Sequence, residues 1–333
     1  MPSLYITEQG ASLKKSGERL IVEKDGQVLL EVQCHKIESI FIFGNIQVTT
    51  QALAEILEHG IELSFLTQQG KLKGRLVPPE SKNISLRMAQ YEKANDREFC
   101  LKMAKIIVSG KLKNSIEVLR RFSYNHPDVE LKQEIKTIED SEERVKDAVT
   151  IQSILGFEGY GSKAYFTGFS KMCLKELKFT GRRKHPATDP INALLSFGYT
   201  LLLNELSAIV EGMGLDPYLG FYHQIEYGRQ SLALDILEEF RQPVIDRFTL
   251  ALTNKKVFTE EDFILDEESG SLHLKQESMK KYFRQYEEYM NQEFTHPVKM
   301  EKTNFRKCLR IQVEAMARAI LSGSDYIPFY FSN

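Results

Sequence analysis

Two segments of the sequence carry side chains that could bind a cation. Glu158 lies among the glycines of residues 156–161, and glycine permits close approach of a backbone or a ligand. His223 ends residues 216–223, which begin with an Asp-Pro pair that favours a turn or a helix start. Each side chain also has a purely structural interpretation, as a glutamate exposed in a turn and as a packed or solvent-exposed histidine.

A third segment, residues 231–241, predicts a helix that is apolar over most of its circumference and ends before Pro243. Asp235 and Glu238 are three residues apart, so a helix places both carboxylates on one face. Such a face is either exposed to water or neutralised by a metal ion or an arginine.

Glu158, His223 and Glu238 together offer two carboxylates and one imidazole. This donor set suits a hard divalent ion, Mn²⁺ or Mg²⁺, better than structural zinc. Such an ion polarises a phosphodiester and stabilises the leaving oxyanion, so the set is typical of a metal nuclease or phosphoryl transferase. The sequence has no GxSxG elbow, P-loop or Rossmann glycine pattern, which makes other enzyme classes less favoured.

Basic residues gather in three stretches, although the formal net charge of the whole chain is only −2. The stretches are residues 102–121, 171–184 and 299–318. Three such stretches could follow a phosphate backbone, whereas solvated helix faces are the alternative explanation. The second stretch supplies the candidate DNA contacts, which are Lys171, Lys175, Arg182, Arg183 and Lys184.

Residues 3–76 predict strands, because β-branched and aromatic runs alternate with turn residues. The Asp25-Gly26 pair indicates a two-residue hairpin. One helix interrupts the strands, with Thr50 as its expected N-cap and Gly60 at its end.

Beyond residue 80 nearly every segment can be phased as a helix. Pro78-Pro79 cannot lie inside a helix, so the domain boundary is expected there, between a β-rich domain at 1–79 and an α-helical domain at 80–333. Helix breaks are expected at Gly110 and at residues 156–161, and residues 258–272 suggest a small hairpin.

With 333 residues the chain is long enough for about two domains, and its composition is that of an ordinary globular protein. The four cysteines form no CxxC pair, which favours a reducing compartment. The N-terminus resembles no signal peptide, and we expect a cytoplasmic protein without a membrane segment.

A family resemblance rests on three motifs in order: GFEGYGSKAYF, then HPATDPINALLSFGYTLL, then LDPYLGFYHQIEYGRQSLALDILEEFR. This order resembles the CRISPR-associated integrase and endonuclease family, protein one of the spacer-acquisition complex of antiviral defence. FIFGNIQVT and residues 326–329 are also similar to that family. The resemblance implies an α+β chain, with an N-terminal β-sandwich-like domain for dimerisation and a mostly helical, metal-dependent C-terminal domain.

The resemblance also implies roles for individual residues. Glu158, His223 and Glu238 match the three metal-ligand positions of the family, and Asp235 matches a neighbouring acidic position that serves behind a ligand or as one. Asp189 and Pro190 match a helix start, where N-cap and N1 positions are a sufficient structural reason for them.

The implied activity is insertion of short duplex DNA into a repeat array by attack of a 3′-hydroxyl on a phosphodiester. The implied partners are double-stranded DNA, the small CRISPR-associated protein two and a second copy of the chain. Two alternatives remain open at this point: a branched-DNA or general metal nuclease, and a non-catalytic dimeric DNA-binding scaffold.

Overall fold

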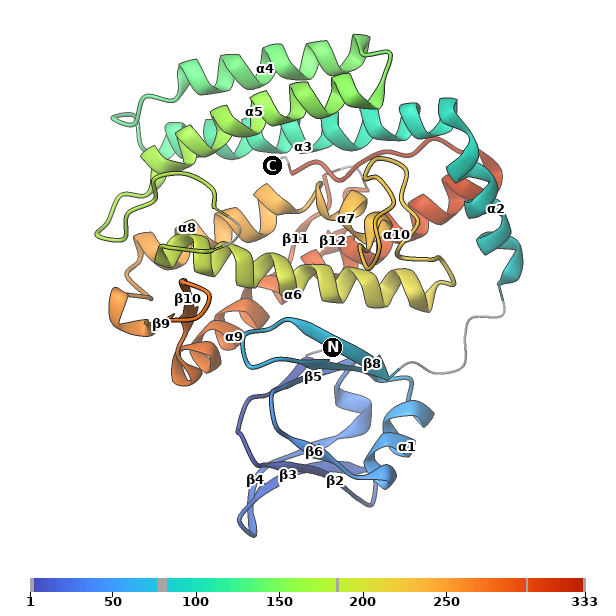
Figure 1. Cartoon of the computed structure of the whole chain (residues 1–333), viewed down its shortest axis with the longest axis vertical. Helices are drawn as coiled ribbons and strands as arrows, with labels where there is room; N and C mark the ends of the chain where they lie inside the picture. Colours follow the sequence, from blue (N-terminus) through green and yellow to red (C-terminus); the bar gives the residue numbers. More distant parts are fainter. Residues whose placement is uncertain (1–2, 77–82, 184–185, 298, 332–333) are drawn as a thin grey trace. The chain divides into compact units, whose positions relative to one another are not determined.

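The computed structural model describes residues 3–76, 83–183, 186–297 and 299–331 (Figure 1). The chain forms two compact units. Unit 1 comprises Met1–Glu80 and Leu274–Asn291, and unit 2 comprises Ser81–His273 and Gln292–Asn333. Pro78-Pro79 and Lys184, which carry two of the expectations from the sequence, lie outside the described residues.

Unit 1 contains two four-stranded sheets, and the first has the strand order β1-β5-β7-β8. Its first three strands are parallel, and β8 pairs antiparallel with β7. The strands span β1 (Ser3–Ile6), β5 (Ser39–Phe43), β7 (Glu62–Leu66) and β8 (Leu72–Leu76). All five residues of β5 are buried, as expected for an apolar central strand.

The second sheet has the order β4-β3-β2-β6. Its strands span β2 (Ser12–Ser16), β3 (Arg19–Lys24), β4 (Gln27–Gln33) and β6 (Gln47–Val48). Asp25 and Gly26 join β3 to β4 with φ angles of 51° and 76°. Positive φ at both central residues is the requirement of a type I′ turn, so the predicted hairpin is confirmed.

One hydrophobic core joins both sheets to the helix α1 (Thr50–Glu58). Leu13 and Leu20 from the second sheet, Ile40 and Ile42 from the first, and Ile56 from α1 are all buried in it. The N-cap of α1 is Thr49, not the expected Thr50. Its side chain accepts a hydrogen bond from the backbone N–H of Ala52 at 3.3 Å, which the neighbouring threonine cannot do from inside the first turn.

The helix α9 (Gln276–Asn291) belongs to unit 1, whereas the sequence analysis placed all residues after 80 in the helical domain. The reason is aromatic packing between residues far apart in the chain. The Phe283 ring stacks on Tyr5 with centroids 4.3 Å apart and contacts Phe43 at 5.0 Å. The Tyr5 hydroxyl also donates a hydrogen bond to Glu287 at 2.8 Å.

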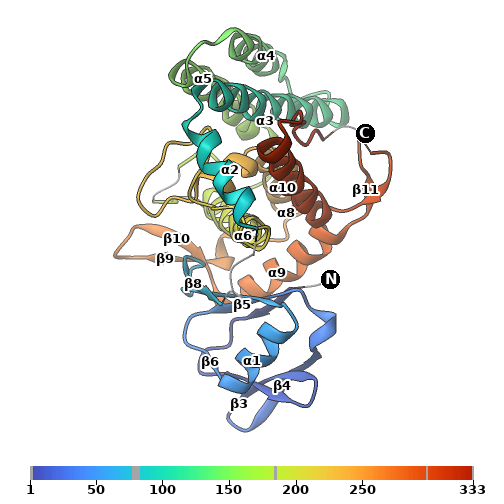
Figure 2. The same cartoon turned by 90° about the vertical axis from the view of Figure 1, so that its right-hand side faces the viewer.

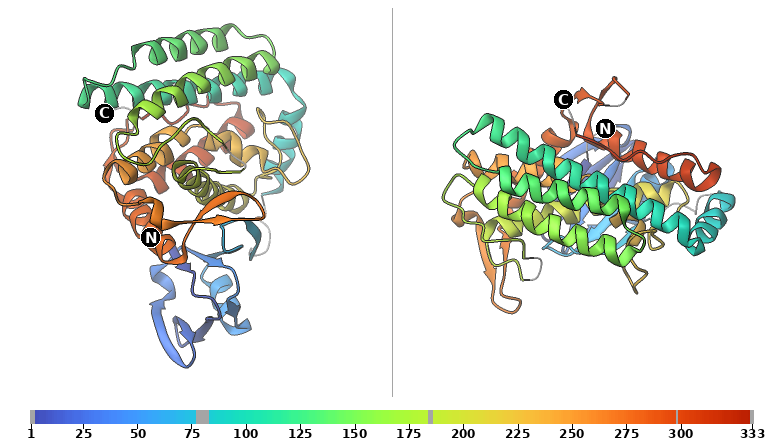
Figure 3. Two further views of the ribbon diagram at one scale, coloured as in Figure 1. Left: turned by 60° about the vertical axis from the view of Figure 1, so that its left-hand side comes forward. Right: turned by 90° about the horizontal axis from the view of Figure 1, so that it is seen from above.

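Unit 2 is mostly helical, and the whole chain therefore has the expected mixed α+β class. Its longer helices are α2 (Ile84–Asn95), α3 (Arg97–Asn125), α4 (Lys132–Asp147), α5 (Ile151–Met172), α6 (Pro190–Gly212), α8 (Arg247–Asn254) and α10 (Phe305–Ser322). Helices α3, α4 and α5 pack side by side, as the green and teal ribbons in Figure 3 show. Helix α2 contacts α3 and α10 (Figure 2).

Two expected helix breaks are absent from the described structure: α3 continues through Gly110, and α5 continues through residues 156–161. Close packing explains two of these glycines. A Cβ atom on Gly110 would lie 2.8 Å from Cβ of Pro328, and one on Gly161 would lie 2.7 Å from Cδ2 of Leu112. The packing contacts offset the helix-propensity cost of glycine, which is only about 1 kcal/mol.

The segment after the loop 213–230 is helical with an irregular centre. Helix α7 (Ser231–Leu237) is followed by a turn, a π-helical segment at Arg241–Asp246 and α8. The chain therefore does not leave its helical path at Pro243, because the wider π-helical turn accommodates the proline.

The remaining strands are short. The expected hairpin is confirmed as β9 (Phe263–Asp266) and β10 (Ser271–Leu274), and β11 (Phe294–Thr295) pairs with β12 (Lys302–Thr303). Asp189 caps α6 by accepting from the backbone N–H of Asn192 at 2.8 Å, with Pro190 at N1, as predicted. Helix α6 is long and apolar enough to cross a membrane, but 72% of its most apolar window is buried, as in a core helix.

Candidate metal centre

Two of the three predicted ligands meet at one buried ammonium group. Glu158 is on α5, Glu238 directly follows α7, and Lys111 reaches them from α3. Nζ of Lys111 lies 2.7 Å from Oε2 of Glu238 and also pairs with Oε1 of Glu158. Oε1 of Glu158 accepts a further hydrogen bond from Ser162, one helical turn along α5, at 2.7 Å.

His223, the third predicted ligand, faces the same carboxylate. Its Nε2 atom lies 3.9 Å from Oε1 of Glu238, and its Nδ1 atom lies 2.7 Å from Oδ1 of Asp235. With Nδ1 donating to Asp235, Nε2 is the ring nitrogen that faces Glu238. This is the arrangement that orients and supports a metal-binding imidazole.

Asp235 is fully buried on α7 and binds the loop that carries His223. Its Oδ2 accepts from the backbone N–H groups of Phe221 and Tyr222 at 2.7 and 3.0 Å, and its Oδ1 accepts from that of His223 at 2.9 Å. A Cβ atom on Gly220 would lie 2.7 Å from Oδ2, so glycine lets the loop approach. The contacts of Asp235 support its interpretation as a positioning residue behind His223.

A second cation pairs with the other carboxylate oxygen of Glu238. Nε of Arg241 lies 2.9 Å from Oε1 of Glu238, and the guanidinium lies over the ring of Tyr199 at 4.7 Å. Arg182 covers the same ring at 5.4 Å. The guanidinium of Arg241, stacked on Tyr199, therefore helps to hold the Glu238 carboxylate in place.

The charges of the site are stabilised by one another. Burial opposes ionisation of Glu158, but the charge and hydrogen bond of Lys111, together with the hydrogen bond from Ser162, lower the pKa of that carboxyl. Burial likewise opposes ionisation of Glu238, but Arg241 and Lys111 hold its pKa well below the usual range. Burial would lower the pKa of Lys111, but Glu158 and Glu238 raise it. Both carboxylates and the ammonium are therefore charged at neutral pH.

Glu239, the neighbour of Glu238, binds the C-terminal segment of the chain. Its carboxylate accepts hydrogen bonds from the Tyr326 hydroxyl, from the backbone N–H of Phe329 at 2.8 Å and from Nε2 of Gln312 at 2.9 Å. Burial raises the pKa of Glu239 to about 7. These contacts hold the turn that carries Glu238 against the chain end.

Asn114 links α3 to the same turn. Its Nδ2 donates to the carbonyl oxygens of Glu239 and Phe329 at 2.8 Å each, and its Oδ1 accepts from the backbone N–H of Phe331 at 2.9 Å. Asn114 lies three residues after Lys111, so the same face of α3 positions the ammonium and holds the chain end.

The sequence patterns do not identify Lys111 and Arg241 as members of this site. Lys111 lies in the basic stretch 102–121, yet its side chain is only 11% exposed. The apolar residues Ile107 and Val108, four and three positions earlier, place Lys111 on the buried face of α3, and this was the available signal.

The candidate DNA-contact residues fall into two groups. Lys171, Lys175 and Arg183 are exposed, although Lys171 also pairs with Glu134 at 2.7 Å. Arg182 is half-buried and donates from Nη1 to Oδ1 of Asn192 at 2.8 Å, which anchors the loop before α6. DNA contact by these residues stays a prediction.

Another cluster of metal-ligating side chains lies in unit 1. Cys34, Glu55 and His59 bring ligand atoms within 4.8 Å of one another. The ammonium of Lys15 already pairs with Glu55. Burial raises the pKa of the Cys34 thiol, so the thiol is protonated at neutral pH. A protonated thiol is a poor ligand for a hard divalent ion, so this cluster suits Mn²⁺ or Mg²⁺ less well than Glu158, His223 and Glu238 do.

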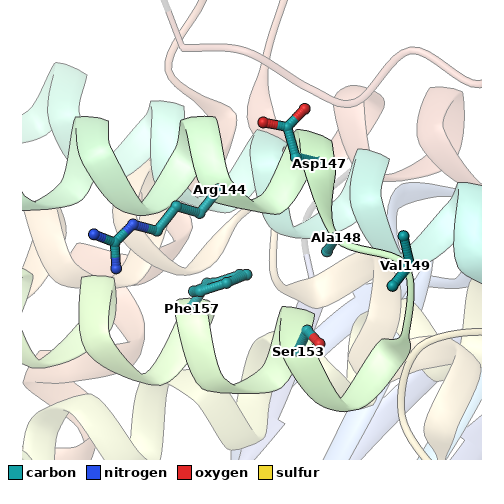
Figure 4. A pocket seen from close by; sticks show the side chains of 6 residues that line it. All are labelled: Arg144, Asp147, Ala148, Val149, Ser153 and Phe157. Atoms are coloured by element: carbon teal, nitrogen blue, oxygen red, sulfur yellow. The ribbon is translucent and has the colours of Figure 1, made fainter.

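A shallow pocket of about 260 Å³ lies where α4 ends and α5 begins (Figure 4). Its lining does not include Glu158, His223 or Glu238. The residues that line it are Arg144, Asp147, Ala148, Val149, Ser153 and Phe157. It is therefore separate from the charged cluster.

The donor chemistry of Glu158, His223 and Glu238 fits a hard divalent ion. Two ionised carboxylates and one imidazole nitrogen are the ligands that such ions accept. The ammonium of Lys111 contacts both Glu158 and Glu238. The space between these two carboxylates therefore favours a positive charge. These three residues could hold the ion, with Asp235 orienting the imidazole.

Comparisons with known proteins identify the family of the chain. The profile of the family described as CRISPR associated protein Cas1 matches residues 4–288. The CRISPR-associated endonuclease Cas1 1 of Chlorobaculum tepidum is 32% identical over 333 residues, which cover 98% of this chain and 97% of that protein.

Solved structures are similar over almost the whole chain. A casposase bound to integration product is 26% identical, with a TM-score of 0.87, and the match covers 99% of this chain and 93% of that one. A chain of a Cas6-RT-Cas1–Cas2 complex has the same fold at 21% identity and a TM-score of 0.82, covering 98% of this chain and 36% of that one. Because the family profile matches residues 4–288 and a relative is 32% identical over 98% of the chain, the chain belongs to the CRISPR-associated Cas1 family.

Proposed function

We propose that this chain is a metal-dependent DNA integrase and endonuclease of CRISPR adaptation. It inserts short duplex DNA into a repeat array by attack of a 3′-hydroxyl on a phosphodiester. The observation that carries the proposal is the convergence of Glu158, His223 and Glu238, from three separate segments, around the buried charge of Lys111. The similarity to a casposase bound to integration product supports strand joining as the reaction.

Glu158, His223 and Glu238 would hold a divalent ion, Mn²⁺ or Mg²⁺. When bound, such an ion polarises a phosphodiester and stabilises the leaving oxyanion. Asp235 keeps the imidazole of His223 in one orientation through Nδ1 and through three backbone N–H groups of its loop. Arg241, stacked on Tyr199, keeps Glu238 ionised and in place.

DNA is the proposed substrate, as spacer fragments and as the repeat array. Exposed basic side chains such as Lys175 and Arg183 support binding to the phosphate backbone. The small CRISPR-associated protein two is the proposed partner, which agrees with the structural neighbour from a Cas1–Cas2 complex.

A homodimer formed through unit 1 is the second part of the proposal. Strand β4 is at the edge of its sheet and exposes three consecutive apolar residues, Val28, Leu29 and Leu30, at 57%, 49% and 44%. An exposed apolar edge strand favours pairing with another chain. We therefore assign dimerisation to the β-rich domain, and metal and DNA binding to the helical domain.

The experiment is a plasmid integration assay with Glu158→Ala, His223→Ala and Glu238→Ala, and with Glu143→Ala as the matched control. Glu143 is a glutamate on α4 whose side chain is 71% exposed and lies outside the three basic stretches. We expect each ligand variant to abolish strand joining while duplex binding and dimerisation persist, because DNA affinity depends on dispersed basic residues. The control should join strands at the wild-type rate.

Wild-type joining by all three ligand variants would contradict the site. Cleavage of plasmid without joining of the supplied oligonucleotide would favour a branched-DNA or general nuclease instead. Duplex binding with neither cleavage nor joining, and without metal binding, would favour a non-catalytic scaffold.

A further inference from the structure

The charge balance of the site raises a question about Lys111. Two carboxylates of the site, Glu158 and Glu238, pair with two cations, Lys111 and Arg241, whereas Asp235 pairs with His223. The two cations are placed differently. Arg241 pairs with Glu238 and stacks on Tyr199, whereas Lys111 contacts Glu158 and Glu238 together.

The contacts of Lys111 use carboxylate oxygens that a metal ion would need. Its Nζ lies 2.7 Å from Oε2 of Glu238 and also contacts Oε1 of Glu158. An ammonium and a divalent ion repel each other strongly at such separations in a poorly solvated site. Both therefore cannot occupy the space between these two carboxylates.

The ammonium of Lys111 can move away from the carboxylates more easily than the guanidinium of Arg241 can. Its ammonium is a compact point charge at the end of a flexible four-carbon stem, whereas the planar guanidinium of a stacked arginine is fixed. The Lys111 side chain is buried, with 11% of its surface exposed. The backbone that carries this side chain is held firmly, because Gly110 lies so near Pro328 that an added Cβ would come within 2.8 Å of it, and because Asn114 binds the C-terminal segment.

We propose that Lys111 is the resident counter-cation of the site: its ammonium holds Glu158 and Glu238 together in the metal-free protein and opposes binding of a divalent ion until it leaves at least one of them. This inference rests on the proposed function, because it takes Glu158, His223 and Glu238 as the metal ligands. Lys111 is accordingly a positioning residue, which sets both the stability of the metal-free site and its affinity for metal.

The test uses the full chain and measures Mn²⁺ binding by isothermal titration calorimetry, together with thermal unfolding in excess chelator. Lys111→Met removes the charge and keeps the length of the side chain, and Lys113→Met is the matched control on the same helix. Glu158→Gln in the wild-type background reports whether Mn²⁺ binds at the proposed site at all.

We expect Lys111→Met to unfold at a lower temperature than wild type in chelator, because two buried carboxylates lose their shared partner. We expect its dissociation constant for Mn²⁺ to fall by about tenfold or more, because the competing charge is gone. Lys113→Met should match wild type in both measurements. Should Lys111→Met fail to fold in chelator, either Mn²⁺ or the added substitution Glu158→Gln should restore folding.

The outcomes separate the two proposals. If Glu158→Gln loses Mn²⁺ binding but Lys111→Met binds Mn²⁺ as wild type does or more weakly, the counter-cation inference fails and the metal site stands. If wild type shows no Mn²⁺ binding that depends on Glu158, the metal site fails and this inference fails with it. A Lys111→Met chain that neither Mn²⁺ nor Glu158→Gln restores also overturns the inference.

Discussion

Nδ1 of His223 lies 2.7 Å from Oδ1 of Asp235. The carboxylate of Asp235 also accepts hydrogen bonds from three backbone N–H groups of the loop that carries His223. The pair connects the loop 213–230 to α7, so the imidazole and Glu238 are positioned by one short helix. A substitution of Asp235 should therefore weaken metal binding by disturbing the orientation of the His223 imidazole.

For Asp235→Asn we predict a loss of strand joining of about 10- to 100-fold, the usual effect of changing the group behind a metal ligand. Mn²⁺ affinity should fall by a similar factor, and duplex binding should be unchanged. The amide nitrogen of asparagine also faces backbone N–H donors, so the melting temperature should fall. Joining and Mn²⁺ binding both as low as in Glu238→Ala would make Asp235 a ligand itself.

A second prediction separates exposed from internal basic residues in the stretch 171–184. The triple variant Lys175→Ala, Lys178→Ala, Arg183→Ala should weaken binding to all duplex sequences alike, because phosphate contacts carry no sequence information. The slope of log K against log salt should become shallower by about 0.9 for each phosphate that the variant no longer neutralises.

Arg182→Ala is the matched comparison for that triple variant. Because Arg182 donates to Asn192 and to Ser196 Oγ at 3.0 Å, its loss should lower the melting temperature, with less effect on the salt slope. Titrations of labelled duplex at several salt concentrations and thermal unfolding check both variants. A salt slope unchanged by the triple variant would remove these residues from the DNA surface.

The buried carboxyl of Asp246 gives a prediction about pH. Burial raises its pKa to about 6, against the hydrogen bond that the Tyr199 hydroxyl donates to it. The folded state then binds this proton more tightly than the unfolded state does, so its stabilising contribution is present at low pH and is lost as pH rises through about 6.

Asp246→Asn should remove this dependence. The free energy of unfolding of the variant, relative to wild type, should rise by about 1.5 kcal/mol between pH 5 and pH 8. Urea unfolding at the two pH values measures the difference. An equal or falling difference would show that Asp246 is not protonated in the folded protein near pH 5.

Two glycines on neighbouring helices offer a matched test of the packing. A Cβ atom on Gly156, in α5, meets nothing within 4 Å, so Gly156→Ala should raise the free energy of unfolding by about 1 kcal/mol through helix propensity. Gly110→Ala, in α3, should lower it, because the added Cβ would lie 2.8 Å from Cβ of Pro328, and overpacking costs about 1–3 kcal/mol. Chemical denaturation of both variants compares them, and a stabilised Gly110→Ala would show that the chain end moves aside freely.

Local patterns predicted much of the fold from the sequence. The Asp25-Gly26 turn, the start of α6 at Asp189-Pro190 and the β9–β10 hairpin each depend on a few neighbouring residues. Helix propensity gave wrong predictions where contacts between distant residues determine the local structure. The glycines of α5 suggested a break, yet packing of Gly161 against Leu112 keeps the helix intact.

Contacts between distant residues also limited the prediction of the site. Glu158, His223 and Glu238 were proposed as a set from their chemistry and from a family resemblance. The role of Lys111 depends on which face of a 29-residue helix is buried, and that is decided by α5 and the turn after α7. The placement of α9 with unit 1 depends similarly on the stacking of Phe283 on Tyr5.

The central claim is that Glu158, His223 and Glu238 together bind a divalent ion. Crystals of the full chain soaked in Mn²⁺ and measured for anomalous scattering test it most directly. The predicted result is an anomalous peak about 2.0–2.3 Å from carboxylate oxygens of Glu158 and Glu238 and from Nε2 of His223, with the Lys111 ammonium displaced from at least one carboxylate. No peak at these residues, or a peak only at Cys34, Glu55 and His59, would contradict the claim.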